Sequence, residues 1–127
     1  MRIEHIALYA KYLEATKDFF VKYFEAQASQ PYHNPKSGFS SYFLSFESGA
    51  RLELMNRPVM EDAPKTVFRT GFSHIAFNLG SAERVDAITA RLHEDGFRVI
   101  NLPRNTGDGY YESCVIDLEG NLIELMV

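Results

Sequence analysis

Two histidines and two glutamates recur in matching surroundings in the two halves of this sequence. Ile-Glu-His-Ile-Ala-Leu around His5 is echoed by Phe-Ser-His-Ile-Ala-Phe around His74, and Arg-Leu-Glu-Leu-Met around Glu53 by Leu-Ile-Glu-Leu-Met around Glu124. The histidines lie 69 positions apart and the glutamates 71, so both recur at nearly one spacing. Such a long internal period indicates a duplicated structural unit. Two imidazoles and two carboxylates suit a divalent metal such as Zn, Ni, Co, Mn or Fe(II).

The elements that must carry these side chains are predicted to be strands. Residues 2–9 alternate in polarity, which places His5 and Ala7 on one face. Each of the two glutamates is flanked by leucine or isoleucine, whose side chains point to the opposite face of a strand. An alanine follows each histidine two residues later, so the face that carries the imidazole has room for a metal and its bound oxygens.

The order of elements predicted for each half of the chain is β-α-β-β-β. The second strand of the first half has the weakest sequence pattern. In the first half we expect a helix at 13–26, a polar loop at 27–38, and strands at 2–9, 39–47 and 51–56. In the second half we expect a helix at 82–95 and strands at 72–79, 97–102, 110–117 and 122–127. The prediction is an α+β fold in one domain, 1–127, with modules at 1–57 and 72–127 and a connector at 58–71.

Composition and charge narrow the class of partner. The chain has 127 residues, of which 46% are hydrophobic and 24% charged, as in ordinary globular domains. Its net charge of −4 and lack of a basic run argue against nucleic acid and acidic membranes, which leaves small molecules. We expect a cytoplasmic protein, because no signal peptide or membrane span is visible and Cys114, the single cysteine, has no intrachain partner. No basic neighbour in sequence lowers the pKa of Cys114, so an inert thiol is expected.

This layout resembles the vicinal oxygen chelate superfamily of glyoxalases, bleomycin resistance proteins and dioxygenases, and within it the small glyoxalase I type. The resemblance covers essentially the whole chain. It implies two paired βαβββ modules whose sheets form an open cup, with one metal held by His5, Glu53, His74 and Glu124. The turn at 117–121, Asp-Leu-Glu-Gly-Asn, also resembles a hairpin of the family, although Leu118 replaces the common proline.

The resemblance implies a lyase or isomerase that removes a proton next to a carbonyl while the metal stabilises an enediolate. Glu124 is implied as the base, and Glu53 as a ligand or second proton carrier. The thiol cosubstrate stays open, because many relatives that use glutathione carry an arginine where this chain has Tyr9. Four residues are candidates for substrate contact: Tyr9, Asn78, Arg104 and Tyr111.

The resemblance also implies a homodimer in which the first module of one chain and the second module of its partner share a metal. Several other functions remain open on the same fold. They are a non-enzymatic drug-binding protein, a coenzyme A thioester epimerase, an antibiotic thiol transferase and a dioxygenase. The last two usually hold their metal by two histidines and one glutamate, so Glu53 argues against them. A drug-binding protein predicts no bound metal and an aromatic groove.

Overall fold

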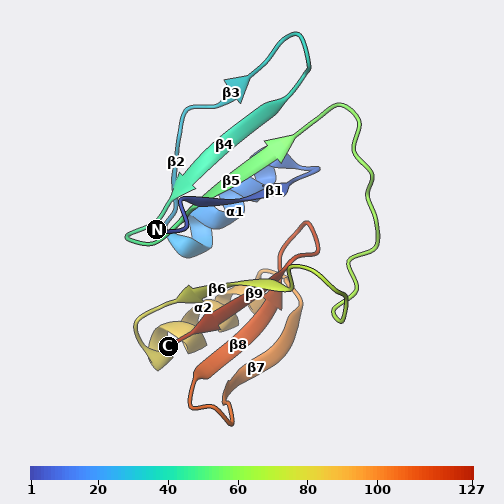
Figure 1. Ribbon diagram of the computed structural model, residues 1–127. Helices are drawn as coiled ribbons and strands as arrows, with labels where there is room; N and C mark the ends of the chain where they lie inside the picture. Colours follow the sequence, from blue (N-terminus) through green and yellow to red (C-terminus); the bar gives the residue numbers. More distant parts are fainter. The chain divides into compact units, whose positions relative to one another are not determined.

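The computed structural model describes all 127 residues, which form two compact units, Met1–Ala63 and Pro64–Val127. Each unit consists of one helix and one sheet with both parallel and antiparallel strands (Figure 1). The predicted α+β class and the two modules are therefore confirmed. That the two units form a single domain stays a prediction. Neither helix has the length and apolar character needed to cross a membrane.

The first unit is built around two long central strands. Its elements are β1 (His5–Tyr9), α1 (Leu13–Phe24), β2 (Gln27–Ala28), β3 (Tyr32–His33), β4 (Ser40–Ser45) and β5 (Arg51–Asn56). The sheet order is β1-β5-β4-β2, with β3 also paired to β4, and only β1 and β5 run parallel.

The prediction of a loop throughout 27–38 is wrong, because β2 and β3 lie within it. Each of these strands has two residues, which is too short for a period-two pattern to appear in the sequence. Both pair with β4 and so satisfy backbone groups along an edge that would otherwise be open.

The second unit repeats the same plan. Its elements are β6 (His74–Asn78), α2 (Ala82–Glu94), β7 (Val99–Asn105), β8 (Tyr111–Ile116) and β9 (Leu122–Met126), in the sheet order β6-β9-β8-β7. As in the first unit, the first strand runs parallel to the last. The predicted end of a strand before Pro103 is wrong, because β7 continues to Asn105. The strand tolerates Pro103 because β7 is an edge strand and this residue lies in the irregular stretch between Asn101 and Arg104, where the regular pairing is interrupted.

The helix of each unit packs on one face of its sheet. The residues that fill these interfaces are at most 3% exposed: Phe20, Leu52 and Leu54 in the first unit, and Leu92, Ile123 and Leu125 in the second. Burying each such side chain contributes about 1.5–3 kcal/mol. A one-residue slip of β5 or β9 would bury a glutamate in place of a leucine, so the apolar face fixes the register.

The turn between β8 and β9 is organised by the carboxylate of Asp117. Its Oδ1 accepts hydrogen bonds from the backbone N–H groups of Glu119 at 2.9 Å and Asn121 at 2.7 Å. Its Oδ2 accepts one from the side chain of Asn121 at 2.9 Å. Burial raises the pKa of Asp117, and these hydrogen bonds oppose that effect. The turn thereby sets the position at which the chain enters β9.

Replacing Asp117 should change how stability depends on pH. A raised carboxyl pKa means that the folded protein holds this proton more tightly than the unfolded chain does. The contribution of Asp117 to the free energy of unfolding is therefore greatest below about pH 3.9, the ordinary aspartate value, and is lost as pH rises through the folded pKa.

Because Asp117→Asn cannot titrate, the difference in unfolding free energy between wild type and variant should vary across that window and be constant above it. Urea unfolding at several pH values measures this difference. Asp108→Asn, in an exposed loop, is the control. A difference for Asp117→Asn that is flat over the whole range would contradict the assignment.

Candidate metal centre

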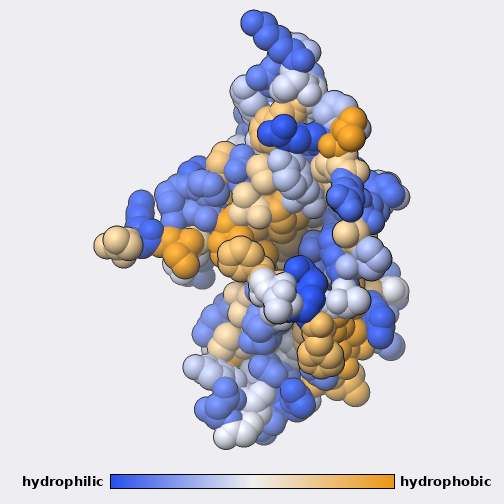
Figure 2. All heavy atoms as spheres, turned by 45° about the vertical axis from the view of Figure 1, so that its right-hand side comes forward, coloured by the Kyte–Doolittle hydropathy of each residue, from blue (hydrophilic) through white to orange (hydrophobic).

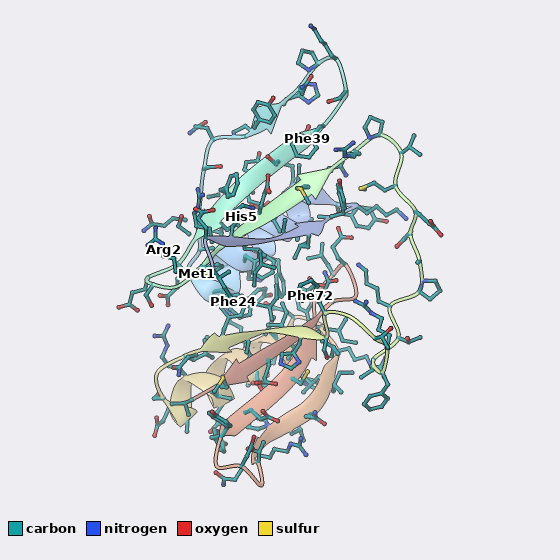
Figure 3. All side chains as sticks on the ribbon, viewed as in Figure 1. Met1, Arg2, His5, Phe24, Phe39 and Phe72 are labelled. Atoms are coloured by element: carbon teal, nitrogen blue, oxygen red, sulfur yellow. The ribbon has the colours of Figure 1, made fainter.

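The parallel strand pairing of each unit brings one histidine beside one glutamate. In the first unit His5 lies opposite Arg51 and Ala7 lies opposite Glu53, so His5 and Glu53 are diagonal neighbours on one face. Nε2 of His5 is 3.8 Å from Oε2 of Glu53. Figure 3 shows His5 on the sheet of this unit.

The second unit repeats this arrangement at the same register. His74 lies opposite Leu122 and Ala76 opposite Glu124, and Nε2 of His74 is 3.3 Å from Oε2 of Glu124. The histidine side chains are 40% and 42% exposed and the glutamates 16% and 21%, so solvent reaches both pairs. The structure thus joins the four predicted ligands as two equivalent His–Glu pairs.

The first pair is surrounded by charged and aromatic side chains. Nδ1 of His5 is hydrogen-bonded to the carboxylate of Glu4, which also binds the guanidinium of Arg51. These two partners hold the pKa of the Glu4 carboxyl below its usual range. The ring of Phe43 lies edge-on to His5 at 5.5 Å and beneath the Arg51 guanidinium at 4.3 Å.

Glu4 was not among the site residues predicted from the sequence. Alternation along the predicted strand at 2–9 places Glu4 on the face opposite His5. In the structure β1 begins only at His5, and the Glu4 carboxylate reaches Nδ1 of that residue. The only available signal was an acidic residue directly beside a candidate ligand.

The second pair has smaller and less polar neighbours. Ser73 and Leu122 stand where the first unit has Glu4 and Arg51, so Nδ1 of His74 lacks the carboxylate partner that His5 has. Cys114 lies opposite Glu124 on β8. Burial, with a smaller effect from the nearby Glu124 charge, raises the pKa of Cys114 to about 11. The thiol is therefore protonated at neutral pH, in agreement with the inert thiol expected from the sequence.

Three of the four predicted substrate contacts lie on the same faces as these pairs. Tyr9 is on β1 and Asn78 on β6, each four residues after the histidine of its strand. Arg104 on β7 lies opposite Glu112 on β8 and donates to that carboxylate at 3.4 Å. The Asn78 side chain accepts a hydrogen bond from the backbone N–H of Gly80 at 2.9 Å.

Tyr111 does not join this group. It is adjacent to Glu112 in β8 and so points to the opposite face, where its hydroxyl donates to Asp86 of α2 at 2.7 Å. The sheet of the second unit therefore separates Tyr111 from Glu124, in contrast to the grouping expected from the sequence.

The donor chemistry of both pairs fits a divalent metal. Metal–nitrogen and metal–oxygen bonds of about 2.0–2.2 Å place two ligands roughly 3–3.5 Å apart at right or tetrahedral angles. The 3.3 Å pair meets this range and the 3.8 Å pair lies slightly beyond it. No group of three or more His, Cys, Asp or Glu side chains is arranged so that it could hold a metal ion. Each pair thus offers two candidate ligands, and a four-ligand shell stays a prediction.

Comparison with known proteins identifies the family. A family model described as the Glyoxalase/Bleomycin resistance protein/Dioxygenase superfamily matches residues 2–125, so the chain belongs to that superfamily. The uncharacterized protein YqjT of Bacillus subtilis (strain 168) is 28% identical over 131 residues, which cover 98% of this chain and 97% of YqjT.

Solved structures give the same result for the fold. A possible glyoxalase from Bacillus cereus is 29% identical with a TM-score of 0.72, covering 100% of this chain and 99% of that one. A domain of this superfamily from Frankia sp. EAN1pec has a TM-score of 0.84 at 14% identity, covering 100% and 97%. Glyoxalase I from Zea mays has a TM-score of 0.80 at 19% identity, covering 98% of this chain and 44% of that one. The predicted family and fold are confirmed.

Cys114 should react slowly with thiol reagents. Raising its pKa to about 11, against about 8.5 for free cysteine, lowers the thiolate fraction at neutral pH by roughly two orders of magnitude. The greater nucleophilicity of a more basic thiolate offsets part of this loss, so alkylation by iodoacetamide should be at least about tenfold slower than that of free cysteine. Mass spectrometry of timed samples measures the rate. Glu124→Gln should speed the reaction modestly, and a wild-type rate equal to that of free cysteine would contradict the assignment.

Proposed function

We propose that this protein is a metal-dependent lyase or isomerase of the glyoxalase I type, which removes a proton from a carbon next to a carbonyl. The observation that carries the proposal is the same His–Glu pair at the same register of both units, with imidazole Nε2 facing the carboxylate in each. Membership of the superfamily supports it.

The two pairs together would hold one divalent cation of the group Zn, Ni, Co, Mn or Fe(II). The ligands are His5, Glu53, His74 and Glu124. Such a cation, when bound, polarises a carbonyl and stabilises the negative charge that develops as the neighbouring carbon loses its proton. The protein's part is to present imidazole nitrogens and carboxylate oxygens on a face that solvent and substrate can reach.

Glu124 is the proposed base that takes the proton. Its strand neighbours are Ala76 and Cys114, two small residues that leave the carboxylate room to move. Glu53 lies between Ala7 and the larger ring of Phe43 and is less exposed, at 16% against 21%. These differences support Glu124 as the mobile proton acceptor, and Glu53 as a ligand or second proton carrier.

The proposed substrate is the hemithioacetal of a 2-oxoaldehyde, which would be isomerised to a 2-hydroxyacyl thioester. Tyr9, Asn78 and Arg104 share the faces of the two pairs and are the proposed substrate contacts. Tyr9 stands where many glutathione-using relatives have arginine, so a thiol other than glutathione is included in the proposal.

Replacing Glu124 should abolish most of the turnover. Glu124→Gln removes the proton acceptor at nearly constant volume and should lower thioester formation from methylglyoxal and thiol by about 10²–10⁴-fold. Tyr111→Phe, on the opposite face of the same sheet, is the matched control and should retain activity. Full activity of Glu124→Gln would exclude this residue as the base. Metal analysis of the purified wild type that finds no divalent ion would favour the drug-binding alternative.

We also propose a homodimer in which His5 and Glu53 of one chain share a metal with His74 and Glu124 of its partner. Figure 2 shows hydrophobic residues at the surface among hydrophilic ones. The exposed apolar side chains include Ile3 at 68% and Phe72 at 87%. These two residues lie next to β1 and β6, each of which is an edge strand of its sheet with unpaired backbone groups. Exposed apolar residues beside open edges support association with a second surface.

Light scattering at micromolar concentration should give twice the chain mass of 14.5 kDa. Replacing Ile3 and Phe72 together by Asp should shift the protein toward monomer and weaken metal binding in parallel, because both ligand pairs would be separated. Val59→Asp is the control, because Val59 is also exposed but lies outside any strand. A wild-type monomer that still holds one metal per chain would contradict a shared site.

A further inference from the structure

In the first unit, a series of polar contacts joins the beginning of β1 to the beginning of β5, and the second unit lacks it. The carboxylate of Glu4 binds Nδ1 of His5 through one oxygen and the guanidinium of Arg51 through the other. The backbone is joined at the same point, since the N–H of Arg51 donates to the carbonyl of Glu4 at 3.1 Å. Glu4 is therefore held at both its main chain and its side chain.

We propose that Glu4 is a positioning residue that fixes His5 in the Nδ1–H tautomer and directs the free lone pair of Nε2 toward Glu53. An ionised carboxylate only accepts hydrogen bonds, so its contact with Nδ1 requires the proton on that nitrogen. Nε2 then carries no proton and can act as a ligand. This inference rests on the proposed metal-binding role of His5.

The contact between His5 and Glu53 agrees with this tautomer. The 3.8 Å between Nε2 and Oε2 is beyond hydrogen-bond distance, so no proton is shared between them. Two acceptors, a bare nitrogen and a carboxylate oxygen, face each other across this gap. A cation between them would satisfy both.

Arg51 has a supporting role in the same chain of contacts. It binds the second oxygen of Glu4 and lies over the ring of Phe43 at 4.3 Å, which restricts the guanidinium to one side of the carboxylate. The Glu4 side chain is 50% exposed and would otherwise sample several rotamers. Arg51 thus favours the rotamer that reaches His5.

The second unit provides an internal comparison. Ser73 and Leu122 replace Glu4 and Arg51, so Nδ1 of His74 has no carboxylate partner of this kind, while its Nε2 lies 3.3 Å from Oε2 of Glu124. The tautomer of His74 is accordingly not fixed by such a partner. A carboxylate on the outer nitrogen orients a metal-binding imidazole and raises its basicity, and its loss typically costs 10–100-fold in metal affinity. We therefore assign His5 as the preoriented ligand of the two.

The test uses nitrogen-15 NMR of the imidazole rings in metal-free protein, at a pH where the histidines are neutral. Wild-type His5 should show a protonated Nδ1 and a bare Nε2. In Glu4→Leu the His5 signals should move toward the Nε2–H form, while Glu4→Gln, whose amide oxygen still accepts, should retain much of the wild-type pattern. His74 should not change in either variant.

Zinc affinity, measured by competition with a chromophoric chelator, gives a second readout. Glu4→Leu should weaken zinc binding about 10–100-fold, with a smaller loss for Glu4→Gln. Glu47→Gln, an exposed carboxylate in the turn between β4 and β5, should have no effect.

Two results would overturn the inference: a wild-type His5 protonated on Nε2, or an unchanged His5 tautomer in Glu4→Leu. If the tautomer shifts as expected but wild-type protein binds no zinc, the positioning role is supported and the proposed metal function fails. The two hypotheses are thereby tested separately.

Discussion

The pairing of the first strand of each unit in parallel with its last strand is the constraint on which the rest of the structure depends. A parallel pair cannot be closed by a tight turn and needs a long crossover connection. Here the crossover contains the helix and the remaining strands, so His5 and Glu53, which are 48 positions apart, become neighbours. The same parallel pairing acts on His74 and Glu124. The contact between imidazole and carboxylate is therefore a product of topology and not of local sequence.

The strand register that buries the apolar core also determines where the candidate ligands point. The leucines of β5 face α1 while Glu53 faces the other way, and β9 has the same alternation. A one-residue shift in register that turned the glutamate to the other face would also turn the apolar side chains out of the core. The turn around Asp117 adds hydrogen bonds that fix where β9 begins. The orientation of each candidate ligand is thus maintained by packing on the far side of its sheet.

Much of this architecture could be predicted from the sequence, because a duplicated His and Glu in matching strands indicates both the repeat and the face. The exceptions have physical causes. The short strands β2 and β3 have too few residues to show a period, and the strand beyond Pro103 depends on an edge position that only pairing reveals. The roles of Glu4 and Tyr111 depend on side-chain contacts with Arg51 and Asp86, which lie 47 and 25 positions away.

The positions that differ between the units bear on the substrate. Tyr9 and Asn78 are equivalent, each four residues after its histidine on the same face, and both are uncharged. The two arginines that the strands carry are each already paired, Arg51 with Glu4 and Arg104 with Glu112. An anionic group on the substrate would have to compete with an internal carboxylate for either cation. Under the proposed function, recognition by neutral groups at Tyr9 and Asn78 therefore fits a small thiol adduct with little negative charge better than one with several carboxylates.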